Sequence, residues 1–180
     1  MQDFEKAMIK TIIGLGNPGA AYEKTRHSVG FMVVNALADQ YGSLWRPQHN
    51  YFVSDIIVGE QKVALIKPQT FMNNSGNIFP YLQKKGIGAS DILVVHDELE
   101  MPFGRVSIKF GGSARGHNGL KSIMTYVGDQ FMRCRIGIGR PLDKDDVSSW
   151  VLEQFRQDEQ AVAVMIKFAV DAIVKEIEKK

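Results

Sequence analysis

Cysteine and long apolar runs are scarce in this 180-residue sequence. A single cysteine, Cys134, excludes a fold held together by disulfides and is typical of a protein kept in a reducing compartment. No apolar run approaches the ~20 residues that a membrane-spanning helix needs. Internal repeats and low-complexity tracts are also absent. We therefore expect a globular, cytoplasmic protein with no membrane partner.

Acidic residues are scarce in one part of the chain. Between residues 104 and 141 a single acid, Asp129, stands among seven basic residues, although the net charge of the whole chain is only +2. A concentrated basic segment in a nearly neutral protein indicates a polyanionic partner at one face. A solvated surface strip explains the same charges equally well, so charge alone leaves both interpretations open.

Strand-like and helix-like periods alternate along the chain. Strands are predicted at 10–15, 51–58, 62–67, 92–96, 106–110 and 133–138, with a hairpin between the second and third. Helices are predicted at 28–41, 77–85, 118–127 and 158–178, the first with Ser28 as its N-cap. This alternation predicts an α/β fold, a single domain over residues 1–180 with a mixed, twisted β-sheet flanked by helices.

The stretch "TIIGLGNPGAAYEKTRHSVGF" begins like a dinucleotide-binding turn, with Gly14, Gly16 and Gly19 at G-x-G-x-x-G spacing. Such a turn needs a helix that starts at the glycines, whereas residues 20–27 carry no apolar stripe. A nicotinamide-dependent oxidoreductase therefore fits poorly, and a titration with NAD tests it. What remains is a turn that presents Asn17, and His27 just before a helix, as either a capping or a catalytic group.

Polar side chains also follow two other buried strands. Asn73 lies in "KPQTFMNNSG", and Asp97 lies at the end of the strand in "ILVVHDELEMPFG". The carboxyl ends of strands in α/β sheets form a crevice, so these residues and Asn17 are expected there. An Asp there either caps a turn or orients the tautomer of a histidine, and Asn73 either caps a helix or donates to a carbonyl. Asn118 follows the glycine-rich stretch "FGGSARGHNGLKSI" and reaches this crevice only if that loop folds back.

Several catalytic chemistries lack the residues they need. Ser113 is not in a G-x-S-x-G turn, because Arg115 occupies the place of the last glycine. Cys134 alternates with apolar residues and is expected to face the core as an inert thiol. The four histidines lack zinc-ligand spacing, so we predict no metal and no cofactor. A hydrolase built from these residues has to activate water, with His27 as its general base.

Taken together, these stretches resemble bacterial peptidyl-tRNA hydrolases. The matching segments are "GLGNPGAAYEKTRHSVGF", "KPQTFMNNSG", "VVHDELEMPFG", "GGSARGHNGLKSI", "RCRIGIGRP" and "WVLEQF". The resemblance implies a monomeric, cytoplasmic enzyme with one α/β domain. Such an enzyme cleaves the ester between a peptide and the 3′-terminal ribose of tRNA, and so recycles tRNA from prematurely dropped chains.

The resemblance also implies roles for individual residues. His27 is then the catalytic base and Asp97 its partner. The residues implied to hold the substrate or line the cleft are Asn17, Tyr22, Met72, Asn73 and Asn118. The basic side chains expected to meet tRNA phosphates are Arg105, Lys109, Arg133 and Arg135.

Two positions depart from the family pattern. Arg115 stands where the glycine-rich loop usually has a small residue, and Ser107 replaces one of two lysines on the basic strand. Both changes concern tRNA docking and not the chemistry. A function of a different class also stays open, a non-catalytic RNA-binding relative like the chloroplast intron-splicing factors that share the fold. The intact His27 and Asp97 favour the enzyme.

Overall fold

The computed structural model describes residues 8–179 and is built on one seven-stranded sheet, ordered β2-β3-β4-β1-β5-β7-β6. The strands are β1 (Thr11–Gly14), β2 (Arg46–Gln48), β3 (Tyr51–Val58), β4 (Gln61–Pro68), β5 (Ile92–Glu98), β6 (Val106–Phe110) and β7 (Met132–Gly137). β1 pairs in parallel with β4 and β5, and β5 in parallel with β7. The β2–β3, β3–β4 and β6–β7 pairs are antiparallel, which confirms the expected mixed sheet.

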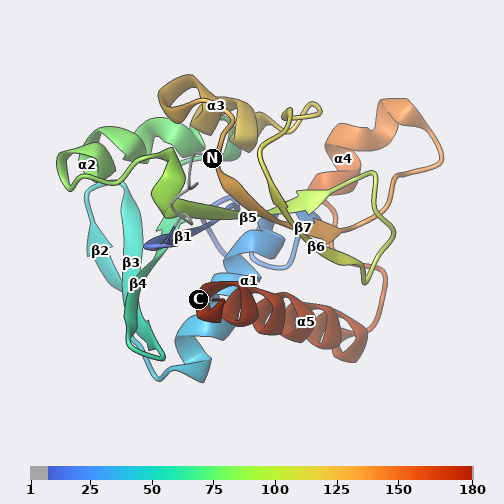
Figure 1. Cartoon of the computed structure of the whole chain (residues 1–180). Coiled ribbons are helices and arrows are strands. Elements are labelled where there is room, and N and C mark those ends of the chain that lie inside the picture. Colours follow the sequence, from blue (N-terminus) through green and yellow to red (C-terminus); the bar gives the residue numbers. More distant parts are fainter. Residues whose placement is uncertain (1–7, 180) are drawn as a thin grey trace, which may run out of the picture.

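Helices cover both faces of the sheet (Figure 1). α1 (Val29–Gln40) and α5 (Glu159–Glu178) pack on one face, while α2 (Phe79–Lys84) and α3 (Asn118–Val127) pack on the other. A short helix, α4 (Val147–Leu152), precedes α5. The 3-10 turns are η1 (Arg26–Ser28), η2 (Met72–Ile78), η3 (Ala89–Asp91) and η4 (Lys144–Asp146). Because both faces are covered, every residue of the central strands β1 and β5 is buried.

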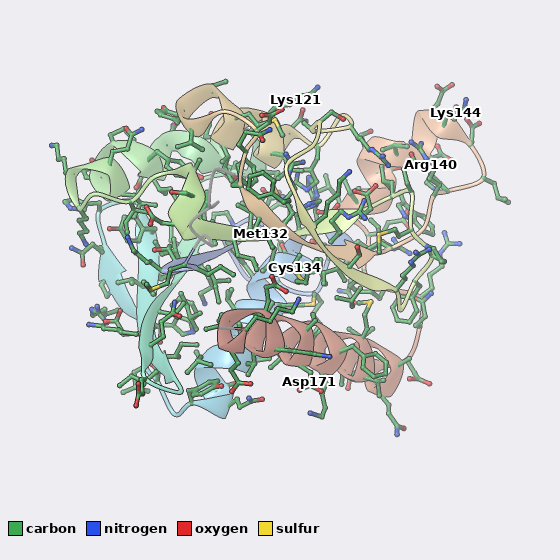
Figure 2. The ribbon with its side chains drawn as sticks, viewed as in Figure 1. Lys121, Met132, Cys134, Arg140, Lys144 and Asp171 are labelled. Carbon is green, nitrogen blue, oxygen red and sulfur yellow. The ribbon has the colours of Figure 1, made fainter. Side chains whose placement is uncertain are left out.

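The core has one apolar layer on each side of the sheet. α5 turns the buried Met165, Ala169 and Ile173 toward the layer that it shares with α1 and one face of the strands. Figure 2 shows Cys134 between the sheet and α5, with Asp171 on the outer side of that helix. Burial raises the pKa of the Cys134 thiol to about 12, which agrees with the expected inert thiol. No helix within residues 8–179 is long and apolar enough to cross a membrane.

Most predicted elements exist, but three details differ. β3, β6 and α3 have the predicted bounds, whereas the helix expected at 77–85 is shortened to α2, because the 3-10 turns of η2 take up its first residues. β2 and α4 were not predicted. The side chain of Ser28 does not cap α1. Its Oγ instead accepts a hydrogen bond from the backbone N–H of Asn17 at 3.1 Å, so the hydroxyl holds the turn after β1.

The glycines of the opening stretch allow a close approach between helix and strand. A Cβ on Gly14 would lie 2.3 Å from the carbonyl oxygen of Gly30 in α1. A Cβ on Gly30 would lie 2.4 Å from the backbone nitrogen of Leu15. α1 begins at Val29, well after Gly19, so no helix starts directly at the glycine turn. The chain therefore lacks the strand–turn–helix geometry of a dinucleotide site.

Candidate active site

Two histidines and one aspartate meet at the end of β5. The Nδ1 atom of His27, in η1, lies 2.9 Å and 3.0 Å from the two carboxylate oxygens of Asp97. The Nε2 atom of His117, just before α3, lies 2.7 Å from Oδ1 of the same carboxylate. Asp97 is almost fully buried, with 2% of its side chain exposed, while His27 is 12% exposed. The cluster is thus enclosed on the protein side and reached by solvent through His27.

The hydrogen bonds fix which ring nitrogen of each histidine carries the proton. The Nδ1 atom of His117 accepts from the backbone N–H of Leu120 at 3.3 Å, as the N-cap of α3. His117 therefore carries its proton on Nε2 and donates it to Asp97. His27 donates its Nδ1 proton to Asp97, which leaves a lone pair on Nε2. No hydrogen bond joins that nitrogen to any residue within 8–179, so Nε2 of His27 can accept a proton from water.

The charges in the cluster favour protonation of His27. Burial lowers the pKa of His27, but the charge of Asp97 and its hydrogen bond outweigh burial, so this pKa lies above its ordinary value. Burial also raises the pKa of Asp97, yet the charges of His27 and His117 and their hydrogen bonds bring it well below its usual range. Asp97 therefore stays ionised and stabilises the imidazolium that forms on His27 during proton transfer.

Asn17 is held next to Ser28 and Met72, and its side-chain NH₂ group makes no hydrogen bond to the described residues. Its Oδ1 accepts from the backbone N–H of Met72 at 2.8 Å, and its own N–H donates to Ser28. Asn17 is 6% exposed. Because the side-chain oxygen is already bonded, the orientation of the amide is set, and no hydrogen bond joins its NH₂ group to any residue that the structure describes. That group is available to donate to a carbonyl oxygen.

The other predicted substrate residues surround η2 and the start of α3. Met72 is buried, and a Cβ on Gly119 would lie 2.5 Å from its Sδ atom, so η2 and α3 touch there. Asn73 and Asn118, each one residue from this contact, are exposed. The sequence places Asn118 near the crevice only if the glycine-rich loop folds back. The loop does fold back, because His117, the residue before Asn118, reaches Asp97.

Phe71, the aromatic partner of the predicted Tyr22, was missed in the sequence. The ring of Phe71 lies edge-on to Tyr22, with centroids 6.2 Å apart at 84°. Phe71 is 59% exposed, although it stands next to the buried Met72. The exposed ring thus lies next to two residues predicted to line the cleft, Tyr22 and Met72. Its place in "KPQTFMNNSG", directly after polar residues at a strand end, was the available signal.

The cluster has the donor set of a metal site, but its hydrogen bonds favour proton transfer. One ligand atom from each of His27, Asp97 and His117 lies within 4.8 Å of the others. A metal on Nε2 of His117 would require the proton on Nδ1, which would then face the donating N–H of Leu120. The cap of α3 therefore opposes metal binding at this nitrogen.

A second polar region, which we call the basic recess, lies between β6, β7 and the glycine-rich loop. It encloses about 90 Å³. The charged and polar side chains that line it are His96, Glu98, Lys109, Ser113, Arg115, Arg133 and Arg135. Burial, reinforced by the neighbouring His117, lowers the pKa of His96 to about 3, so this ring is neutral. The recess holds four cationic side chains and one carboxylate, and therefore suits an anion.

The basic residues expected to meet phosphates occupy different surroundings. Lys109 is exposed and Arg135 half-buried at the recess, while Arg105, also exposed, does not line it. Arg133 is only 3% exposed, and its guanidinium donates to the carbonyl oxygens of Gly112 and Ser113. These contacts do not support the prediction that Arg133 meets tRNA phosphates directly. Its face of β7 was predicted correctly, but the loop that covers this face was not.

His117 is the main residue of the cluster that the sequence did not reveal. It stands in "GGSARGHNGL", twenty residues from Asp97 along the chain. The positive φ angles at Gly112 (110°), Arg115 (46°) and Gly116 (83°) turn the loop back toward β5. The glycines signalled an irregular loop, but nothing in the spacing indicated where it would lead.

Comparison with known proteins identifies the family. The family model described as "Peptidyl-tRNA hydrolase" matches residues 11–180. The peptidyl-tRNA hydrolase of Fervidobacterium nodosum is 43% identical over 163 residues, covering 90% of this chain and 86% of the relative. That of Listeria innocua is 46% identical over 169 residues, covering 92% and 91%. A crystal structure of peptidyl-tRNA hydrolase from Acinetobacter baumannii superposes with a TM-score of 0.83 at 34% identity, covering 97% of each chain. The chain belongs to the peptidyl-tRNA hydrolase family.

Proposed function

We propose that this protein hydrolyses the ester that joins a peptide, or an N-acylated amino acid, to the 3′-terminal ribose of tRNA. The observation that carries this proposal is the His27–Asp97 pair, in which Nδ1 is bonded to the carboxylate and Nε2 is left to act on water. Family membership supports the same substrate. The reaction returns tRNA from prematurely dropped chains to translation.

His27 moves the proton in both halves of the reaction. Its Nε2 takes a proton from water as the water oxygen bonds to the ester carbonyl carbon. The carbonyl oxygen becomes an oxyanion. When the tetrahedral intermediate collapses, the C–O bond to the ribose breaks, and the ribose oxygen takes the proton back from Nε2. Asp97 keeps Nδ1 protonated throughout and stabilises the imidazolium between the two transfers.

Amide groups suit the remaining task of holding the peptide. Asn17, Asn73 and Asn118 offer N–H donors that do not titrate, and such donors bind peptide carbonyls and stabilise a developing oxyanion. The fixed orientation of Asn17 makes it the best placed of the three to recognise the first amide of the peptide. Tyr22 and Met72 supply the apolar walls of the cleft.

Phosphates of the tRNA then meet the basic side of the molecule. Lys109 and Arg135 at the basic recess, together with the exposed Arg105, can contact backbone phosphates without reading sequence. The enzyme could in this way accept many tRNAs. Arg133 acts indirectly in this arrangement, because it holds the backbone of the loop at Gly112 and Ser113.

The test compares N-acetylaminoacyl-tRNA with free aminoacyl-tRNA as substrates of the purified protein. An N-acyl group adds a carbonyl that the Asn17 amide can bind, whereas a free α-ammonium only adds donors. An unpaired buried amide costs about 1–3 kcal/mol, so we expect about five- to 150-fold faster release of the N-acetyl amino acid. Asn17→Asp keeps the acceptor for the Met72 N–H but removes the donor, and should reduce this preference.

Two outcomes would contradict the proposal. Binding of tRNA without release of the N-acetyl amino acid would indicate the non-catalytic RNA-binding relative instead. Equal turnover of the two substrates would mean that the asparagines do not recognise the first amide.

A further inference from the structure

Arg115 has an unusual backbone conformation for a residue with a side chain. Within residues 8–179, only His49 and Arg115 have a positive φ angle without being glycine, and that of Arg115 is 46°. Its neighbour Gly116, at 83°, is a glycine, as expected for this region of φ/ψ space. A left-handed conformation costs free energy for any residue with a Cβ. A glycine at position 115 would avoid that cost.

The side chain of Arg115 reaches the mouth of the basic recess. It lines this recess together with Lys109 and Arg135. Its Nη1 atom lies 3.8 Å from Oε1 of Glu98, which is too far for a hydrogen bond. The Arg115 side chain is 53% exposed, and that of Glu98 is 10% exposed. The guanidinium therefore stays near the recess through a weak ion pair and keeps its hydrogen-bond donors available.

The walls of the recess contain further donors without partners. The Nε atoms of Arg133 and Arg135 are buried and have no hydrogen-bond partner among the residues that the structure describes. The Nη2 atom of Arg135 is bonded to Ser107 Oγ at 3.1 Å, so this side chain is fixed while its Nε stays unpaired. Buried N–H groups of cations are normally bonded. The two arginines therefore add positive charge to the walls of the recess, which favours an anion there.

We propose that Arg115 is a specificity-determining residue for the phosphate end of the substrate, exchanging the carboxylate of Glu98 for a phosphate oxygen of tRNA at the basic recess. This inference rests on the proposed function. The planar guanidinium offers two parallel N–H donors to one phosphate, which a small residue at this position does not. The ion pair with Glu98 is long, and the buried Glu98 keeps Arg133 as a cationic neighbour when the pair breaks.

The test uses Arg115→Gly, because this change should weaken tRNA binding without lowering stability. We expect KM for N-acetylaminoacyl-tRNA to rise about two- to five-fold with kcat unchanged. The dependence of tRNA affinity on salt should flatten by about one contact. The melting temperature should stay the same or rise, since glycine adopts the positive φ angle without strain. Arg115→Lys keeps the charge without the fork and should fall between the two proteins.

Arg46→Gly is the matched control for the loss of one positive charge. Arg46 is an exposed arginine on β2, at the opposite edge of the sheet from β6. It should leave KM and the salt dependence close to those of the unaltered protein. An N-acetylaminoacyl ester of adenosine, which has no phosphate, should be hydrolysed equally well by Arg115→Gly and the unaltered protein.

Three results would overturn the inference. Unchanged KM and salt dependence in Arg115→Gly would show that Arg115 makes no phosphate contact. A lower kcat on the adenosine ester would show that it acts through its neighbour His117 on the chemistry. An equal effect in Arg46→Gly would show that only net charge matters. If the unaltered protein released no N-acetyl amino acid from tRNA, the proposed function would fail instead.

Discussion

Two polar regions meet at the end of β5, and their hydrogen bonding differs. In the catalytic cluster both oxygens of Asp97 are bonded to histidine N–H groups, and both tautomers are fixed. In the basic recess, one buried nitrogen of each of His96 (Nε2), Arg133 (Nε) and Arg135 (Nε) has no hydrogen-bond partner among residues 8–179. The cluster is organised for one proton transfer, while the recess carries an excess of positive charge that suits an anion. Chemistry and tRNA binding should therefore be separable by mutation.

Replacing the base tests this separation with the largest expected effect. His27→Ala should reduce kcat by about 10²–10⁴-fold, because the groups that remain are poor bases. The pKa of Asp97 lies well below its usual range, and both ring nitrogens of His117 are hydrogen-bonded. The affinity for tRNA should remain almost unchanged, since the recess lies on other segments. His49→Ala, an exposed histidine on a distant loop, is the matched control. If His27→Ala kept most of its activity on peptidyl-tRNA, the mechanism would be wrong even though the family is right.

Replacing Asp97 tests whether the catalytic cluster can lose activity while tRNA binding is kept. In Asp97→Asn, the amide oxygen can still accept from His117, whose tautomer the Leu120 N–H fixes. The amide NH₂ then faces Nδ1 of His27 and favours the tautomer with its proton on Nε2. Activity should fall by about 10²-fold or more without vanishing, while tRNA binding stays intact.

The pH dependence of the same variant gives an independent measurement. Asp97 holds the pKa of His27 above its ordinary value, so the rate should drop on the acid side as His27 becomes protonated. Removing the carboxylate charge lowers that pKa, and the acid limb of kcat/KM should move to lower pH in Asp97→Asn. A limb that stays in place would mean that His27 is not the titrating base.

Mutations in the basic recess should weaken tRNA binding, whereas mutations in the catalytic cluster should lower kcat. Lys109→Ala should flatten the salt dependence of tRNA affinity by about one contact and raise KM more than it lowers kcat. Lys62→Ala, on the β3–β4 hairpin far from the recess, controls for the lost charge. An unchanged slope in Lys109→Ala would return the basic segment to the role of a solvated surface strip.

Metal removal should have the smallest effect. The cluster of His27, Asp97 and His117 has metal-ligand spacing, but its proton positions oppose coordination. Exhaustive chelation should leave the hydrolysis rate unchanged, provided that the tRNA is kept folded. Recovery of a chelated, inactive enzyme on addition of zinc would contradict the tautomers assigned to the two histidines.

The strength of local patterns explains which elements were predictable. β3 alternates, and α3 and α5 have clear apolar faces, so their periods were visible in the sequence. β2, with the sequence Arg46-Pro47-Gln48, has no alternation and exists only through pairing with β3. α4 has six residues, too few to display a helical period.

The same distinction applies to the site. Residues placed by strand ends, such as Asn17 and Asp97, could be located from the sequence, because strand order and direction put them at one edge. His117 and the burial of Arg133 depend on the path of the glycine-rich loop, which φ angles and long-range packing decide. Ser28 was predicted as the N-cap of α1, but its hydroxyl instead bonds to the backbone of Asn17.

The bond between the Leu120 amide and the His117 ring has a practical consequence. It places one backbone N–H a single imidazole away from the carboxylate that serves the base. In an isotope-labelled sample, the NMR chemical shift of that amide should follow the charge state of the His27–Asp97 pair as pH changes. Small molecules that enter the crevice should shift the same resonance. The start of α3 thus contains an intrinsic spectroscopic reporter for screening inhibitors without any attached label.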